Sequence, residues 1–188
     1  MFDYRTFPTL ETERLRLREI ILKDRHAIFA IRNDYEVTKF NTGAAYVDIH
    51  QADQLITGMR DEYRNRKAIR WGITHKTDDI VMGMVGFNYW DTRDNRGSIG
   101  FDLARAYWRK GIMSEAVQAV LRFGFIQMAL NRTEADASIY NTASINLLGK
   151  LGFVQEGHQR EQYYEDGKYH DLLLFALLKR DWQQLQER

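Results

Sequence analysis

Residues 108–116, which read WRKGIMSEA, have the types and spacing of an anion-binding site. A basic, glycine-containing turn runs here directly into an apolar-striped helix. The first amides of a helix lack partners within it, and the helix dipole is positive at that end, so such a start binds phosphate. Gly111 lets an anion approach the backbone, and Ser114 adds a hydroxyl. Arg109 or Lys110 can pair with an outer phosphate, although an ordinary basic turn capped by Ser114 is the alternative.

The sequence lacks the motifs of several other chemistries. It contains no cysteine, which excludes disulfides, cysteine-bound zinc, iron–sulfur clusters and thiol catalysis. It has neither the Gly-x-x-x-x-Gly-Lys-Ser/Thr loop nor the Gly-x-Gly-x-x-Gly turn of nucleotide-binding folds, and no Gly-x-Ser-x-Gly nucleophile elbow. Its 5 histidines form no His-x-x-x-His pair, so we predict no metal site.

The composition is that of an ordinary globular protein. The chain has 188 residues, 44% hydrophobic and 28% charged, with a net charge of +1, which fits one domain spanning residues 1–188. The small net charge argues against a nucleic-acid partner. The longest apolar run, residues 172–178, is far shorter than the roughly 20 residues of a membrane helix, and the first residues lack a signal-peptide pattern. We therefore expect a cytoplasmic protein without a membrane partner.

The candidate anion site must be held by a mixed α/β framework. Apolar residues recur at helical spacing after Asp24 and after Asp48, which predicts two helices that begin at these aspartates. Alternating or β-rich runs separated by short turns predict a first strand and then an antiparallel meander of three strands. These four strands are expected at residues 15–18, 69–73, 80–90 and 98–103.

The second half of the chain predicts a crossover and a hairpin. Helical spacing over residues 112–128, closed by Asn131, precedes an alternating strand at 133–140. Two strands joined through a helix in this way pair in parallel, so one parallel pair is expected in a mostly antiparallel sheet. The remaining predicted elements are a helix at 141–151 ended by Gly152, a hairpin of 153–164 and 168–178 turning at Asp166 and Gly167, and a polar tail at 181–188 with a helical turn.

Residues 107–116, YWRKGIMSEA, resemble the acyl-CoA pyrophosphate loop of the GNAT (GCN5-related) N-acetyltransferases, and more narrowly that of the ribosomal-protein N-terminal (alanine/serine) acetyltransferases. Trp108 and Met113 depart from the general loop, although Trp108 is usual in the narrower group. Three further stretches are similar to that group and occur in the same order: ERLRLR at 13–18, Asn141-x-x-Ser144 followed by KLGF at 150–153, and EG at 156–157 with the hairpin turn.

The resemblance covers nearly the whole chain. It implies a single GNAT domain of α/β class, with a mostly antiparallel central sheet, a splayed parallel pair and flanking helices. Acetyl-CoA would be the co-substrate, lying in the gap between strands 98–103 and 133–140, with no metal. Its pantetheine arm would pair with strand backbone and with Asn141, which can also serve as a helix cap. The implied cofactor-binding residues are Phe101, Leu103, Arg109, Lys110, Gly111, Ile112, Met113, Ser114 and Asn141.

The resemblance also implies a course for the reaction. The amine attacks the thioester directly, a strand amide polarises the carbonyl, and Ser144 donates a proton to the leaving thiolate, unless it only satisfies a backbone group of its helix. Leu148 stands where many members have an acid tyrosine. Glu161 is the implied base, with Glu115 and Asp171 as alternatives. A weak base suffices for an α-amine, because roughly 10–15% of it is neutral at pH 7.

The acceptor implied most directly is a protein N-terminal α-amine. Two alternatives stay open: a small acceptor such as a polyamine, amino acid or antibiotic, and a non-catalytic acyl-CoA-binding regulatory domain. Dimers are common in the family, so the resemblance also allows a homodimer. Five aromatic residues could line an acceptor pocket or pack in the fold, namely Tyr89, Trp90, Trp108, Tyr163 and Tyr164.

Overall fold

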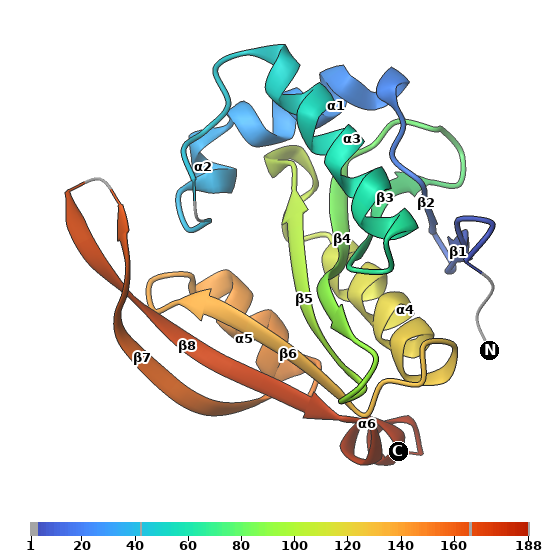
Figure 1. Ribbon diagram of the computed structural model, residues 1–188, viewed down its shortest axis with the longest axis vertical. Helices are drawn as coiled ribbons and strands as arrows, with labels where there is room; N and C mark the ends of the chain where they lie inside the picture. Colours follow the sequence, from blue (N-terminus) through green and yellow to red (C-terminus); the bar gives the residue numbers. More distant parts are fainter. Residues whose placement is uncertain (1–3, 42, 166, 188) are drawn as a thin grey trace.

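A computed structural model describes residues 4–41, 43–165 and 167–187, so Asp166 of the predicted turn and Arg188 of the predicted tail lie outside the described residues. Within these ranges the strands form one sheet in the order β1-β2-β3-β4-β5-β6-β8-β7 (Figure 1). The strands are β1 (Leu10–Glu11), β2 (Leu15–Arg18), β3 (Ile69–His75), β4 (Gly83–Asp91), β5 (Arg96–Leu103), β6 (Arg132–Ser138), β7 (Val154–Glu165) and β8 (Lys168–Leu178). The predicted meander and the C-terminal hairpin are confirmed.

Helices cover both faces of this sheet. The helices are α1 (Arg25–Asn33), α2 (Tyr35–Thr38), α3 (Ile49–Arg64), α4 (Ile112–Ile126), α5 (Thr142–Lys150) and α6 (Lys179–Gln186), with short 3₁₀ turns η1 (Leu22–Asp24) and η2 (Arg105–Tyr107). One hydrophobic core unites α4 and α5 with β2 to β6 and β8, and a second, smaller core packs α1 and α3 on the other face. In the part of the chain that is described, no helix is long and apolar enough to cross a membrane.

The helix boundaries follow local chemistry. Asp48 accepts a hydrogen bond from the amide of His50 and caps α3, as the sequence predicts. Gly152 takes a φ of 88° after α5, where the amide of Phe153 bonds the carbonyl of Leu148 at 3.0 Å. The predicted end of α4 at Met128 is two residues too late. The helix stops at Ile126, and Ala129 adopts a φ of 56° ahead of the predicted closing residue Asn131.

The parallel pair is present and is short. Strands β5 and β6 pair at only three positions, where Arg96–Ser98 faces Arg132–Glu134, and then separate (Figure 1). Each strand keeps its other neighbour beyond that point, because β5 stays paired with β4 up to Leu103 and β6 with β8 up to Ser138. The sheet therefore opens into a wedge between two strands that are each held from outside.

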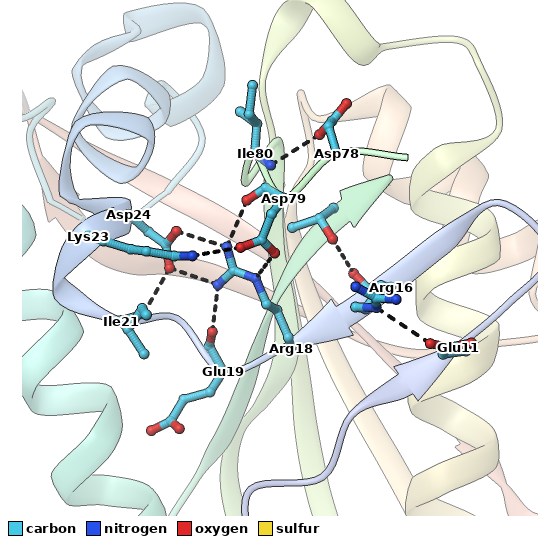
Figure 2. Close-up of polar contacts among 11 residues, drawn as sticks. Glu11, Arg16, Arg18, Glu19, Ile21, Lys23, Asp24, Asp78, Asp79 and Ile80 are labelled. Atoms are coloured by element: carbon cyan, nitrogen blue, oxygen red, sulfur yellow. Dashed lines mark hydrogen bonds and ion pairs between the residues drawn. The ribbon is translucent and has the colours of Figure 1, made fainter. Parts of the chain in front are cut away.

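Arg18 anchors the helical layer that covers one side of this wedge. Its guanidinium lies between Asp24 and Asp79 (Figure 2), and it donates to the two Asp24 oxygens at 2.8 and 2.9 Å. Asp24 precedes α1, but its side chain accepts from the amide of Ile21 at 2.9 Å instead of capping that helix as predicted. Because the side chains of Arg18 and Asp24 are largely buried, this ion pair fixes the start of α1 against β2.

Candidate functional site

A cleft of about 670 Å³ lies beside the C-terminal end of β5 and the N-terminal ends of α4 and α5. We call it the α4 cleft. It brings together all the residues predicted to bind cofactor except Lys110, namely Phe101, Leu103, Arg109, Gly111, Ile112, Met113, Ser114 and Asn141. The ammonium of Lys110 instead lies 5.6 Å from the centroid of the Tyr107 ring. A loop, a strand end and two helix starts that are distant in sequence thus share one concave surface.

The loop before α4 turns twice through left-handed conformations. Arg109 has a φ of 60°, and Gly111, at the N-cap of α4, has a φ of 75° with ψ of 0°. No side chain caps the helix start, so its first amides are available to an anion. The indole nitrogen of Trp108 donates to the carbonyl oxygen of Leu103 at 2.7 Å, which ties the loop to β5.

Glu115, in the first turn of α4, connects the loop before this helix to the N-terminal segment of the chain. Its carboxylate accepts hydrogen bonds from Thr12, and from the amide and guanidinium of Arg14 at 3.0 and 2.7 Å. Burial opposes ionisation, but these hydrogen bonds hold the pKa of Glu115 below its usual range. Arg14 also donates to the carbonyl oxygen of Lys110 at 3.1 Å. Glu115 lines neither this cleft nor the chamber described next, so it supports the loop and does not meet the role of base.

Backbone groups at the end of β5 face the wedge, and of these the Leu103 carbonyl oxygen is bonded to Trp108. The amide of Ala104 bonds the carbonyl of Met82 at 2.9 Å, which sets the alternation of the β4–β5 ladder. By that alternation Asp102 directs its amide and carbonyl toward β4, whereas Phe101 and Leu103 direct theirs toward the gap. Phe101 can therefore pair with an extended ligand in the gap, as a missing strand would.

A second cavity of about 330 Å³ lies deeper between the separated strands, and we call it the inner chamber. Ser144 lies where the chamber and the α4 cleft meet, since both cavities share the lining residues Phe40, Asn41, Phe101, Asp102, Asn141 and Ser144. Asn141 is the N-cap of α5 and accepts from the amide of Ser144 at 3.1 Å. The hydroxyl of Ser144 makes no hydrogen bond to any described residue. Leu148 is 0% exposed and packs in the core.

Two aspartates line the inner chamber in different environments. The Asp102 carboxylate accepts from Asn41 at 2.7 Å and from Arg32 at 3.1 Å, and the side chains of Arg32 and Asp102 are each 15% exposed. Asp136, on β6, has no such cation beside it among the described residues, and although its side chain is exposed to solvent, partial desolvation raises the pKa of its carboxyl. Sequence reasoning missed both aspartates, because in an alternating strand they read as solvent-facing residues.

The C-terminal hairpin brings Tyr163 to the inner chamber, whereas Glu161 lies outside both cavities. Glu161 is exposed, has a φ of 52° in a bulge of β7, and lines neither cavity. Its amide donates to Asp171 at 2.8 Å, and that bond, with the Nε2 of His158 at 2.7 Å, lowers the pKa of Asp171. Tyr163 faces the chamber instead, stacked on His170 with ring centroids 4.9 Å apart. The prediction that Glu161 is the base stays a prediction.

Of the other aromatic residues predicted to line a pocket, one lines a cavity and three contact side chains elsewhere in the fold. Trp108 lines the α4 cleft, whereas Trp90 stacks on Tyr4 with centroids 5.2 Å apart. The Tyr89 hydroxyl donates a hydrogen bond to the Glu134 carboxylate, and Tyr164 packs edge-on against Tyr169. No group of three or more histidine, aspartate or glutamate side chains among the described residues could hold a metal ion.

Known proteins are similar to this chain in sequence and in architecture. A family model described as an acetyltransferase (GNAT) domain matches residues 14–154. The chain belongs to the GNAT acetyltransferase family. This GNAT protein is 40% identical over 174 residues to the uncharacterized N-acetyltransferase p20 of Bacillus licheniformis, covering 93% of this chain and 98% of that one. It is therefore an acetyltransferase with the predicted mixed α/β fold.

Two further proteins that are similar to this chain are acetyltransferases named for ribosomal proteins. The GNAT chain is 28% identical over 135 residues to the [ribosomal protein uS5]-alanine N-acetyltransferase of Escherichia coli (strain K12), covering 69% of this chain and 68% of that one. The structure of the ribosomal L7/L12 alpha-N-protein acetyltransferase RimL in complex with coenzyme A superposes with a TM-score of 0.83 at 19% identity, covering 91% of this chain and 98% of that one. At that identity the superposition shows a shared fold.

Proposed function

We propose that residues 1–188 act as one N-acetyltransferase domain that transfers the acetyl group of acetyl-CoA to a protein N-terminal α-amine. The observation that carries this proposal is the meeting of two cavities at Ser144. A long co-substrate in the α4 cleft can present its thioester where an amine arrives through the inner chamber. The RimL complex supports the co-substrate, because a chain of this fold there holds coenzyme A. The uS5-alanine enzyme supports the α-amine acceptor.

In this proposal the α4 cleft binds the cofactor along its length. The amides at the start of α4 and the loop residues Arg109 to Ser114 take the pyrophosphate, since helix starts favour anions. The backbone of Phe101 and the amide of Leu103 face the gap and pair with the pantetheine arm, whereas the Leu103 carbonyl oxygen is already bonded to Trp108. Lys110 lies beside the cleft and supplies positive charge from its rim. Asn141 adds a side-chain contact while it caps α5.

The transfer is a direct attack on the thioester. The neutral amine forms the new C–N bond at the acetyl carbon, and the carbonyl oxygen gains negative charge, which the gap-facing amide of Phe101 stabilises. When the C–S bond breaks, the sulfur leaves with its electron pair and takes a proton from the Ser144 hydroxyl. That hydroxyl is replenished by the second proton of the amine nitrogen. The products are the amide and coenzyme A thiol.

Release of free thiol across a panel of amines tests the proposal. We expect turnover with peptides that have a free α-amine and none with the same peptides after Nα-acetylation, even when they contain lysine. Polyamines and free amino acids are the competing acceptors, and preference for one of them would replace the peptide assignment. No release with any amine, despite bound acetyl-CoA, would overturn the enzymatic proposal.

Ser144→Ala tests the proton donor. We expect kcat to fall about 100-fold, within the usual range for general acid catalysis. Acetyl-CoA affinity should stay within about twofold, because the serine is expected to act on the leaving thiolate and not on the phosphates. Asn146→Ala is the matched control on the exposed side of α5 and should behave as wild type. A wild-type kcat for Ser144→Ala would remove this residue from the mechanism.

A further inference from the structure

The inner chamber contains one carboxylate whose charge no described residue neutralises. Of the two aspartates that line it, Asp102 is paired with Arg32 and Asn41. Asp136 has no hydrogen-bond or ion-pair partner among the other described side chains. An ionised carboxylate in such a place attracts a cation of matching size, and a primary ammonium has that charge and size.

The position of Asp136 on β6 favours this role. It follows the three paired positions of β5 and β6, so it lies where the strands have already separated. Its flanking residues Ala135 and Ala137 are buried toward the α4 side, and strand alternation turns Asp136 toward the α1 side of the sheet. Gly100 lines the same chamber from β5, and the side chain of Asn88 lies over it where a Cβ would otherwise be.

The charged and titratable groups around Asp136 come from four elements. Arg32 of α1 is engaged with Asp102 of β5. Arg70 of β3 donates to Asn88 at 2.9 Å, and its terminal nitrogen lies 3.8 Å from Glu62. Tyr163 of β7 lines the same chamber, and burial, followed by the charges of Glu165 and Asp136, raises the pKa of its phenol. Both arginines of the chamber thus have other carboxylate partners, and Tyr163 is neutral at physiological pH.

We propose, as an inference that rests on the proposed function, that Asp136 binds the ammonium form of the acceptor amine and removes a proton from that ammonium before the amine attacks the thioester. The carboxylate accepts one proton from R–NH₃⁺ and becomes a carboxylic acid, which leaves a neutral amine in the chamber. After the C–N bond forms and the C–S bond breaks, Asp136 releases its proton to solvent. The chamber walls partly desolvate this carboxyl and raise its pKa, although the side chain stays accessible to solvent, so it is a stronger base than an unperturbed aspartate and an incoming amine can reach it.

The pH dependence of Asp136→Asn tests this assignment. With the base present, the enzyme uses the abundant ammonium form, so kcat/KM for an α-amine peptide should be nearly flat between pH 6 and pH 8. Without it, only the neutral amine reacts, and an amine of pKa about 8 is roughly 1% neutral at pH 6 and 10% at pH 7. We therefore expect the kcat/KM of Asp136→Asn to be lower than that of the wild type by about 100-fold at pH 6, about tenfold at pH 7 and less than about twofold at pH 9.

Three controls separate this role from structural damage. Asp61→Asn makes the same charge change at an exposed position of α3 that lines neither cavity, and should keep the flat profile. Asp136→Glu retains a carboxylate and should keep the flat profile at a lower rate. Asp136 lines only the inner chamber, so acetyl-CoA affinity measured by calorimetry should not change in Asp136→Asn.

The outcomes also distinguish the inference from the proposed function. If the wild type releases no thiol with any amine, the proposed function fails. If the wild type turns over and the profile of Asp136→Asn runs parallel to it at every pH, the function stands and the role of Asp136 is overturned. A kcat/KM of Asp136→Asn that is low at pH 6 and approaches the wild-type value as the pH rises and the amine loses its proton supports the proposal.

Discussion

Ser114 offers a substitution that should move stability and cofactor binding in opposite directions. It lies in the first turn of α4 and lines the α4 cleft. An aspartate there would face the positive end of the helix dipole, which stabilises a helix by about 0.3–1 kcal/mol. The same negative charge would lie among the amides that the proposal assigns to the pyrophosphate.

The size of the binding effect follows from Coulomb's law. A carboxylate about 5 Å from one phosphate charge costs about 3 kcal/mol at an effective dielectric constant of about 20. That energy corresponds to about 100-fold weaker binding. Ser114→Asn is the matched control, because it has the shape of the aspartate without its charge. Its acetyl-CoA affinity should be within about tenfold of wild type.

Calorimetric titration and urea unfolding of the two variants measure these effects. Ser114→Asp should bind acetyl-CoA far more weakly than Ser114→Asn, while its free energy of unfolding is equal or higher. The difference in binding should shrink as salt is added, since a partly exposed charge pair is screened. Equal acetyl-CoA affinity for the two variants would refute the assignment of the pyrophosphate to the start of α4.

Three further predictions concern the framework of the site. Gly111→Ala should lower the free energy of unfolding by about 1 kcal/mol, because φ is 75° there while a Cβ would meet only Arg14 at 3.4 Å; unchanged urea stability would contradict it. Arg18→Ala should cost about 3 kcal/mol, because it leaves buried Asp24 unpaired, and a thermal shift near zero would argue against that. Glu115→Gln should be about 1 kcal/mol less stable than wild type above pH 5. Because the folded pKa of Glu115 is lowered, this difference should vanish as pH falls through that pKa, and a gap that persists at low pH in urea titrations would contradict the reasoning.

The local parts of this molecule could be predicted from its sequence. The cap at Asp48, the loop that begins α4 and the cap at Gly152 depend on neighbouring residues, so their patterns are visible in a single segment. The parallel pair follows from the order of strand, helix and strand. The α4 boundary was wrong by a few residues because Ala129 takes a left-handed conformation that is usual for glycine.

The parts that depend on distant contacts could not be predicted. Glu115 was an alternative base implied by the family resemblance, and its contacts with Thr12 and Arg14, about 100 positions earlier in the chain, were not visible in any local pattern. Asp102 is neutralised by Arg32 and Asn41, which come from segments that pack on it only after folding. The family resemblance implied the separation of β5 and β6, but no local pattern showed that Asp136 lines the chamber that this separation opens.

We propose that acetyl-CoA occupies the α4 cleft and gives its acetyl group to an amine in the inner chamber. Calorimetric titration of the purified protein with acetyl-CoA, followed by addition of an α-amine peptide to the saturated complex, tests both assignments in one experiment. We expect saturable binding at one site per chain and release of thiol only after the peptide is added. Absence of saturable binding would contradict the assignment of the cleft, and binding without thiol release for any amine would contradict the assignment of the chamber.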